Sequence, residues 1–172
     1  MALVETMTKH LCGEVHHLRA YEAQIKPCID CRYCWEQHDC AISDDMDAIY
    51  DLIESVDNII VASPIYFSEL TGALLNLMSL LQRYYAIKYI QRDKGFGLKE
   101  KLGGLILVGG GDGNANCAMH TADVLFRLMN VKSQGTVLSH NTNRVPASED
   151  IMALKQARDL AERLKKANTK DE

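Results

Sequence analysis

Hydrophobic positions along the chain follow two alternating spacings, which predicts alternating helices and strands. Residues 58–63 and 102–108 are unbroken apolar runs rich in branched side chains, which is typical of strands covered on both faces. Ser43 and Asp44 stand where a helix cap is expected, just before a segment of helical periodicity. Helical spacing of apolar residues is found at 3–11, 46–56, 115–129 and 147–166.

Three further segments complete the expected order of elements. Residues 14–21 and 134–138 resemble short strands, and residues 70–87 predict a long, largely apolar helix. A helix this apolar is expected to be buried or to lie in an interface. Strands that alternate with helices call for a parallel sheet with right-handed crossovers, so we expect one α/β domain over residues 1–172.

Two unusual loops follow the apolar strands and carry the candidate ligand site. Because ligands bind outside the carboxyl ends of parallel strands, both loops are expected on one rim of the sheet. The first leaves its strand through a proline and offers backbone polar groups beside aromatic side chains, as a flat ring with polar edges requires. Its residues are Ser63, Pro64, Ile65, Tyr66, Phe67 and Ser68. The alternative is a turn whose aromatic side chains join the core.

The second loop is rich in glycine and consists of Gly109, Gly110, Gly111, Asp112, Gly113 and Asn114. Glycines permit close backbone approach, so the N–H groups of such a loop can face a ligand. The loop lacks the lysine of a P-loop and does not complete the G-x-G-x-x-G pattern of dinucleotide-binding proteins. A flexible turn is the alternative, but four glycines in five positions favour ligand contact.

Four cysteines lie within thirteen residues, at Cys28, Cys31, Cys34 and Cys40. Two successive x2 spacings place three thiolates around a metal cluster, as in ferredoxin-type [4Fe–4S] ligation. Zinc is an alternative in which His38 replaces one cysteine, although zinc more often uses two separated pairs of ligands. A third reading is that small buried thiols pack and bind nothing. The remaining cysteines, Cys12 and Cys117, are expected to be buried apolar residues.

Composition and charge narrow the class of protein. The chain is 47% hydrophobic and 24% charged, as ordinary soluble globular proteins are. A net charge of −4 argues against a nucleic-acid partner, because phosphate contacts need clustered Lys and Arg. No apolar stretch approaches the roughly 20 residues that span a bilayer, and Glu5 and Lys9 interrupt any secretory signal. We therefore expect a cytoplasmic protein with no membrane partner, whose cysteines do not form a disulfide framework.

The cysteine block and the first rim loop together resemble a known family. The order Lys26-Pro27-Cys28-x2-Cys31-x2-Cys34-x5-Cys40, then Asp44-Asp45-Met46, then Ala62-Ser63-Pro64-Ile65-Tyr66-Phe67 is similar to that of the flavodoxin-like NAD(P)H-dependent FMN reductases. It resembles most their iron–sulfur flavoprotein branch. This resemblance implies a flavodoxin-like three-layer sandwich with the cysteine-motif loop 26–42 after the second family strand. It also implies that both rim loops surround the isoalloxazine ring of FMN and that the four cysteines hold a cluster near the flavin.

The same resemblance implies a first strand that the chain lacks. Family members open with a central strand and a polar loop that holds the FMN phosphate at a helix N-terminus. This chain begins where the first helix would already be under way. We therefore expect either a truncated start of the chain or direct pairing of strand 14–21 with strand 58–63.

The implied function is FMN-dependent oxidoreduction. Electrons from NADH or NADPH would pass through the flavin to a small-molecule or protein acceptor, with the [4Fe–4S] cluster as a further carrier. Because the flavin supplies the chemistry, no side chain is expected to act as an essential acid or base. The resemblance implies a homodimer or homotetramer. The alternatives are a non-enzymatic electron carrier or metal-binding module, and a degenerate flavodoxin-like protein that no longer binds FMN.

Overall fold

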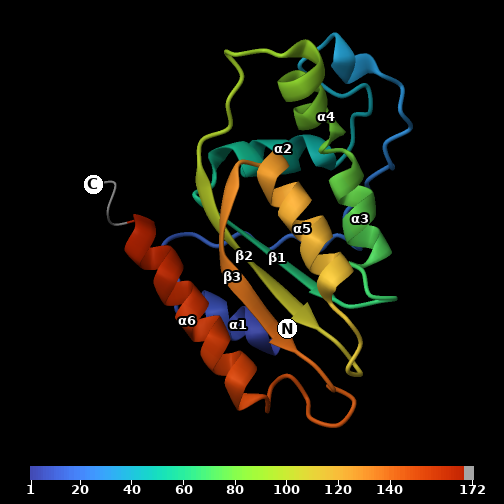
Figure 1. Ribbon diagram of the computed structural model, residues 1–172. Coiled ribbons are helices and arrows are strands. Elements are labelled where there is room, and N and C mark those ends of the chain that lie inside the picture. Colours follow the sequence, from blue (N-terminus) through green and yellow to red (C-terminus); the bar gives the residue numbers. More distant parts are fainter. Residues whose placement is uncertain (169–172) are drawn as a thin grey trace.

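A three-stranded parallel sheet forms the centre of the molecule, which is described for residues 1–168 by a computed structural model. The strands are β1 (Asn58–Pro64), β2 (Lys101–Val108) and β3 (Val131–Ser139), in the order β1-β2-β3. Helices lie on both sides of the sheet (Figure 1). The expected α/β three-layer fold is therefore confirmed, and the apolar runs at 58–63 and 102–108 are its two neighbouring strands.

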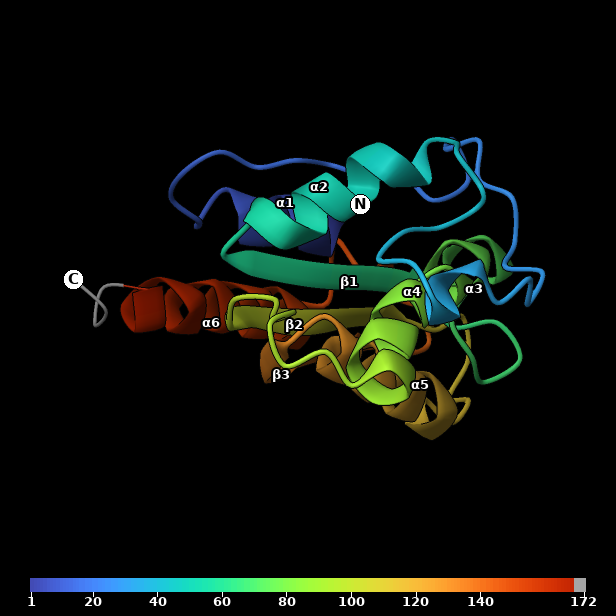
Figure 2. The ribbon, with the colours of Figure 1, turned by 90° about the horizontal axis from the view of Figure 1, so that it is seen from above.

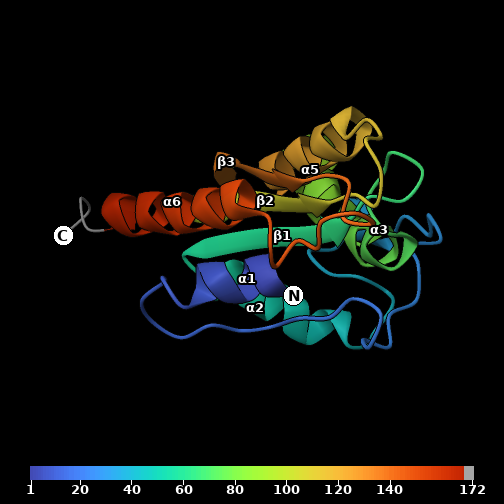
Figure 3. The ribbon, with the colours of Figure 1, turned by 90° about the horizontal axis from the view of Figure 1, so that it is seen from below.

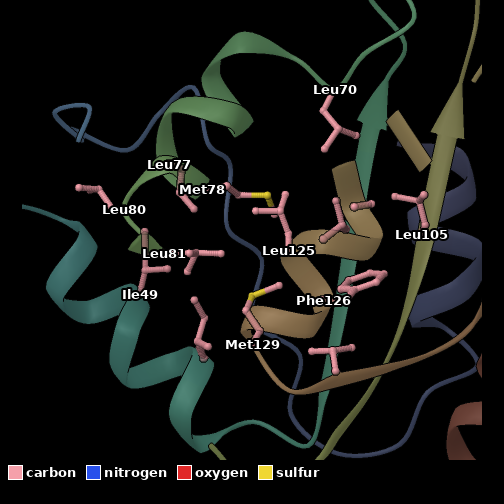
Figure 4. Packing of buried hydrophobic residues seen from close by; sticks show 14 of the residues in the cluster. Ile49, Leu70, Leu77, Met78, Leu80, Leu81, Leu105, Leu125, Phe126 and Met129 are labelled. Carbon is pink, nitrogen blue, oxygen red and sulfur yellow. The ribbon is translucent and has the colours of Figure 1, made fainter. Parts of the chain in front are cut away.

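Two separate cores fill the spaces on the two sides of the sheet. On one side α1 (Ala2–Thr8) packs against the long helix α6 (Ile151–Asn168) and both cover the sheet. On the other side α2 (Met46–Ser55) and α5 (Asn116–Leu128) contribute to a larger core. Figure 4 shows this core, in which side chains such as Leu77 and Met78 of α3 and Leu125 and Phe126 of α5 fill the space beside the sheet.

The register of the ladders brings the carboxyl ends of all three strands to one edge. Pro64 pairs with Val108, and Val108 in turn pairs with Ser139. Because ligands of parallel sheets bind outside the carboxyl ends of the strands, this edge is where a site is expected. The segments that follow the three strands therefore begin side by side.

The expected strand at 14–21 is absent, and this prediction was wrong. The segment is an exposed loop that runs outside the helices on that side of the sheet (Figure 2). Charged and polar residues such as Glu14, His16 and Arg19 leave it without an apolar face to bury, and Arg19 starts a turn that closes on Glu22. Among the described residues β1 therefore pairs with β2 alone.

The expected helix at 70–87 is interrupted, which corrects a second prediction. It forms α3 (Gly72–Ser79), then α4 (Gln82–Tyr85) and then a π-helical turn η2 (Ala86–Gln91). The break falls at Leu80, whose carbonyl oxygen accepts a hydrogen bond from the hydroxyl of the buried Tyr50 at 2.7 Å. The same carbonyl also accepts the amide of Arg83 at 3.1 Å, and the amides of Leu80 and Leu81 bond to carbonyls three residues earlier, so a tighter turn replaces the regular α-helical bonds here.

The last helix starts later than its apolar pattern indicates. Asp150 caps α6: its carboxylate accepts hydrogen bonds from the Ala153 amide at 3.0 Å and the Ser139 hydroxyl at 2.8 Å. The cap thus joins the start of α6 to the end of β3. Figure 3 shows α6 and β3 from below. None of the helices in the part of the chain described has the length and apolar character needed to cross a membrane.

Candidate functional site

The two rim loops predicted from the sequence lie next to each other at the carboxyl edge of the sheet. The amide of Ile65 donates to the carbonyl of Val108 at 2.8 Å, which extends the β1–β2 ladder into both loops. The amide of Gly109 donates in the same way to Ser139 at 2.8 Å. The structure therefore brings the Ser63–Ser68 and Gly109–Asn114 segments together, although neither is close to its partner in sequence.

The first rim loop holds its aromatic side chains away from the core. Ser63 is buried, and its hydroxyl accepts the amide of Thr71 at 3.1 Å, which fixes the base of the loop. Phe67 and Ser68 both have positive φ, at 54° and 65°, so the chain reverses sharply here. Phe67 is fully exposed and Tyr66 is 59% exposed. The alternative in which these aromatics join the core is excluded, and their faces are open to a ligand.

The second rim loop directs its backbone N–H groups outward. Within the described residues, the amides of the segment from Gly110 to Asn114 donate to no protein acceptor. The carbonyl groups of Gly109, Gly110 and Gly111, by contrast, accept hydrogen bonds from the backbone amides of residues 142, 143 and 141, respectively. A Cβ atom at Gly111 would meet nothing within 4 Å, so open space lies in front of the loop. Free amides around open space suit a ligand with acceptor atoms.

The segment after β3 completes the rim, and the sequence analysis missed it. A Cβ at Gly110 would lie only 3.0 Å from the side chain of Asn143, so a side chain at position 110 would require Asn143 to shift. His140 lies beneath Gly109, and its Nδ1 is buried without a hydrogen-bond partner. The polar run His140-Asn141-Thr142-Asn143 directly after a strand was the available signal.

The rim fits the isoalloxazine end of FMN. A planar ring with polar edges needs aromatic or apolar surface on one side and hydrogen-bond donors at its rim. The exposed ring of Tyr66 supplies the first, and the free amides from Gly110 to Asn114 supply the second. The orphaned Nδ1 of His140 beneath the same loop is a further polar group of the kind that a bound ligand satisfies.

The four motif cysteines line one small cavity, with a volume of about 40 Å³. It lies at the end of the molecule marked by α4, whereas the rim loops lie at the opposite end of the strands (Figure 1). Helix α3 separates the two places and spans about 12 Å from Gly72 to Ser79 at the usual helical rise. The structure therefore gathers the cysteines but does not bring them to the rim loops.

Burial and mutual proximity govern the chemistry of the cysteine cavity. Burial raises the pKa of the Cys34 thiol, and the neighbouring Cys40 and Cys28 raise it further. Burial likewise raises the pKa of Cys40. A positively charged metal centre relieves both effects, because it stabilises thiolates.

The donor set of this cavity is four thiols, which are ligands of the type that an iron–sulfur cluster takes. In residues 1–168 no three His, Cys, Asp or Glu side chains are placed to hold a single ion. Four thiols around one cavity are nevertheless the ligands that a [4Fe–4S] cluster takes, and a cluster is wider than one ion. Cys12 and Cys117, expected to be buried, are exposed and lie outside this cavity.

Side chains from α3 and η2 fix the cysteine loop. The amide of Cys28 donates to Ser79 Oγ at 3.1 Å. The side-chain amide of Gln91 donates to the carbonyls of Cys34 and Gln37, both at 2.9 Å. These supporting residues are far from the motif in sequence, which is why its spacing did not reveal them.

The start of α2 holds the chain that leads into the cysteine loop. The carboxylate of Asp44 accepts the amide of Met46 at 2.9 Å as a helix cap, and the amide of Lys26 at 2.9 Å. Asp45 accepts the amide of Gln24 at 2.7 Å. The predicted cap at Asp44 is confirmed, and it has a second role that ties the segment before the first cysteine to the core helix.

Comparison with known proteins identifies the family of the chain. The model of the NADPH-dependent FMN reductase family matches residues 2–144. The chain belongs to this family. An iron–sulfur flavoprotein of Methanosarcina thermophila is 37% identical over 87 residues, which are 51% of this chain and 42% of the relative. A second iron–sulfur flavoprotein, from Methanocaldococcus jannaschii, is 33% identical over 96 residues, which are 56% of this chain and 46% of the relative.

These relatives place the chain in the iron–sulfur flavoprotein branch of the FMN reductase family. The matched regions span less than half the length of the two relatives. Solved structures confirm the fold. The azoreductase AzrA has a TM-score of 0.68 at 17% identity, with 94% of this chain and 88% of AzrA covered. RosB, solved with a bound riboflavin-phosphate derivative, has a TM-score of 0.68 at 16% identity, with 94% of this chain and 68% of RosB covered.

Proposed function

We propose that this protein is an FMN-dependent oxidoreductase that takes electrons from NADH or NADPH and passes them to a small-molecule or protein acceptor. The observation that carries this proposal is the outward row of free amides from Gly110 to Asn114, next to the exposed aromatics of the first rim loop, in a chain of the FMN reductase family. Bound FMN supplies the hydride and electron transfer chemistry.

The residues of the rim bind and orient the ring. The exposed faces of Tyr66 and Phe67 provide a wall that excludes water. The amides from Gly110 to Asn114 donate to the polar edge, where negative charge develops on reduction, and hydrogen-bond donors stabilise such charge. Ser63 and Thr71 hold the base of the first loop, so the wall keeps its position. No side-chain acid or base is required of the chain in this scheme.

The four cysteines would hold a [4Fe–4S] cluster as a second electron carrier. Cys28, Cys31, Cys34 and Cys40 line one cavity, and their spacing is that of ferredoxin-type cluster ligands, which supports this part of the proposal. The exposed Tyr33 and Trp35 beside the cavity provide a surface on which a protein acceptor could dock.

A second candidate is an electron carrier or metal-binding module that works through the cysteines alone. The separation of the cysteine cavity from the rim loops by the length of α3 favours this candidate. It requires no flavin, so a single measurement of bound chromophores distinguishes the two functions.

The test is anaerobic purification followed by absorption spectroscopy and titration with FMN. The proposed function predicts flavin bands, saturable FMN binding, and reduction of the flavin by NADH or NADPH. A brown iron–sulfur shoulder in a protein that rejects added FMN supports the carrier instead. A colourless protein that also rejects FMN contradicts both.

Substitution of one cysteine locates the cluster. Cys31→Ser should remove the iron–sulfur shoulder and leave the flavin bands, because Cys31 lies in the cysteine cavity and away from the rim. Cys117→Ser is the matched control, since Cys117 is an exposed cysteine outside the cavity. Equal loss of the shoulder in both variants would contradict the proposed ligands.

A further inference from the structure

Arg83 lies between the cysteine loop and the larger core. It is the second residue of α4, and it lines the cavity that contains the four cysteines. Its guanidinium carbon lies 4.4 Å from the centre of the Tyr50 ring. The side chain is only 17% exposed, although an arginine is usually at the surface. The plane of the guanidinium is therefore stacked on a buried aromatic residue.

The nitrogen atoms of the same guanidinium contact the two residues just before Cys40, the last cysteine of the motif. Its Nε donates to the carbonyl of His38 at 3.0 Å. One terminal nitrogen lies 3.7 Å from the carboxylate of Asp39, and the other lies 3.9 Å from that of Glu54 on α2. Arg83 therefore connects α2 and α4 to the two residues that immediately precede Cys40.

These contacts determine where Cys40 lies relative to the other cysteines. Cys34 is already positioned by α4 and η2, through Gln91 and through the carbonyl of Gln82, 4.0 Å from its Sγ. Cys40 follows Cys34 by six residues, and nothing in the motif spacing itself fixes that longer stretch. Gln91 holds Gln37 and Asp93 lies 3.1 Å from the His38 ring, and Arg83 adds the contacts with the His38 carbonyl and with Asp39, next to Cys40.

The charge of Arg83 acts on the cavity more strongly than that of a surface arginine. A cluster with four thiolate ligands is negatively charged, and a partly buried cation is screened less by water and salt. Arg32 lines the same cavity, but its side chain is 62% exposed, 3.7 Å from Asp30 and stacked on Trp35. The two arginines thus form a matched pair that differs in burial.

We propose that Arg83 is the positioning residue of the cysteine site: it fixes the Cys40 end of the loop and provides the positive charge that favours reduction of the bound group. The inference rests on the proposed cluster at the four cysteines. It assigns a role to a residue outside the cysteine motif. Lysine keeps the charge at this position but has neither the planar stacking surface nor the fork of N–H donors.

The experiment compares the wild type with Arg83→Lys, Arg83→Gln and Arg32→Gln after anaerobic reconstitution with iron and sulfide. Two quantities are measured for each protein: the rate at which a chelator removes iron, and the midpoint potential of the bound cluster. Circular dichroism checks that each variant is folded. The potential is the readout that a purely structural role would not change.

The expected results separate the two roles of Arg83. Both Arg83 variants should lose iron about tenfold faster, as removal of a supporting residue weakens metal sites. Arg83→Gln should also have a more negative potential, whereas Arg83→Lys should keep the wild-type potential. Arg32→Gln should match the wild type in both measurements.

Other outcomes overturn the inference. Wild-type iron release in Arg83→Lys, or equal shifts in Arg83→Gln and Arg32→Gln, would show that Arg83 has no special role. If Arg83→Gln does not fold, the rate at which Arg83→Lys loses iron to the chelator tests the inference by itself. A wild-type protein that takes up no cluster refutes the proposed cluster and this inference together, whereas a loaded wild type with unaffected Arg83 variants refutes only the inference.

Discussion

The backbone amide of Cys28 donates to the hydroxyl oxygen of Ser79 at 3.1 Å, so the first cysteine of the motif is tied to the last residue of α3. The residues are 51 positions apart in the chain. Ser79 also donates to the carbonyl of Asn76 at 2.7 Å. A single hydroxyl thus connects a helix end to the start of the cysteine site.

We predict that Ser79→Ala lowers the free energy of unfolding by about 1–3 kcal/mol, because it leaves the partly buried Cys28 amide without an acceptor. Chemical denaturation of the metal-free protein measures the change. Ser55→Ala is the control, since Ser55 makes a similar bond to a backbone carbonyl within its helix but is exposed and supports no other segment. Equal losses in the two variants would show that the Cys28 contact contributes nothing.

The open space at Gly111 allows a substitution that should block FMN binding without destabilising the fold. Gly111→Leu should weaken FMN binding at least about tenfold, because the new side chain occupies the space in front of the free amides. Flavin fluorescence during titration measures the affinity. Gly97→Leu is the control, since a Cβ there also meets nothing within 4 Å, and Gly97 precedes the start of β2, at the other end of that strand from the rim. Unchanged affinity in Gly111→Leu places the flavin elsewhere.

Asp150 predicts a specific loss of stability in acid. The hydrogen bond from the Ala153 amide, followed by that from the Ser139 hydroxyl, lowers the pKa of Asp150 below its usual value. A carboxyl whose pKa is lower in the folded state stabilises the fold above its unfolded pKa, and this contribution disappears as the pH falls through the folded pKa.

Asp150→Asn keeps an acceptor oxygen but removes the charge at the helix N-terminus, so it should cost about 0.5 kcal/mol of unfolding free energy at neutral pH, and the difference from the wild type should vanish in acid. Urea unfolding over a series of pH values measures both. Asp159→Asn, on the exposed side of the same helix, should show neither effect. A difference that is constant with pH would mean that the Asp150 charge is not involved.

Two adjacent glycines in β2 should differ in their tolerance of a methyl group. A Cβ at Gly103 would lie 2.5 Å from the backbone carbonyl oxygen of Ile59, whereas a Cβ at Gly104 would meet only the side chain of Leu160, at 2.6 Å. A side chain can move aside more easily than a paired strand. Gly103→Ala should therefore destabilise by about 1–3 kcal/mol and Gly104→Ala by less. Thermal unfolding compares them, and the reverse order would contradict the sheet register.

Much of the fold could be predicted because strong local patterns agree with the tertiary environment. The run at 102–108 is buried along most of its length in the central strand β2, whereas the run at 58–63 is only partly buried in the edge strand β1. The segment 14–21 misled the prediction because a short alternating stretch becomes a strand only if a neighbour pairs with it. The apolar pattern did not reveal the break at Leu80, where the carbonyl accepts the hydroxyl of Tyr50, thirty residues earlier in the chain.

The sequence by itself determined the chemistry of this protein: four closely spaced thiols, an aromatic loop and a glycine loop, each defined by neighbouring residues. Only the tertiary structure decided which of these groups meet. The parallel register joins the two loops at one rim, while the break in the apolar helix carries Arg83 to the cysteine cavity at the opposite end. The reason is that residue spacing fixes local geometry, whereas strand register and helix packing depend on contacts between residues far apart in the chain.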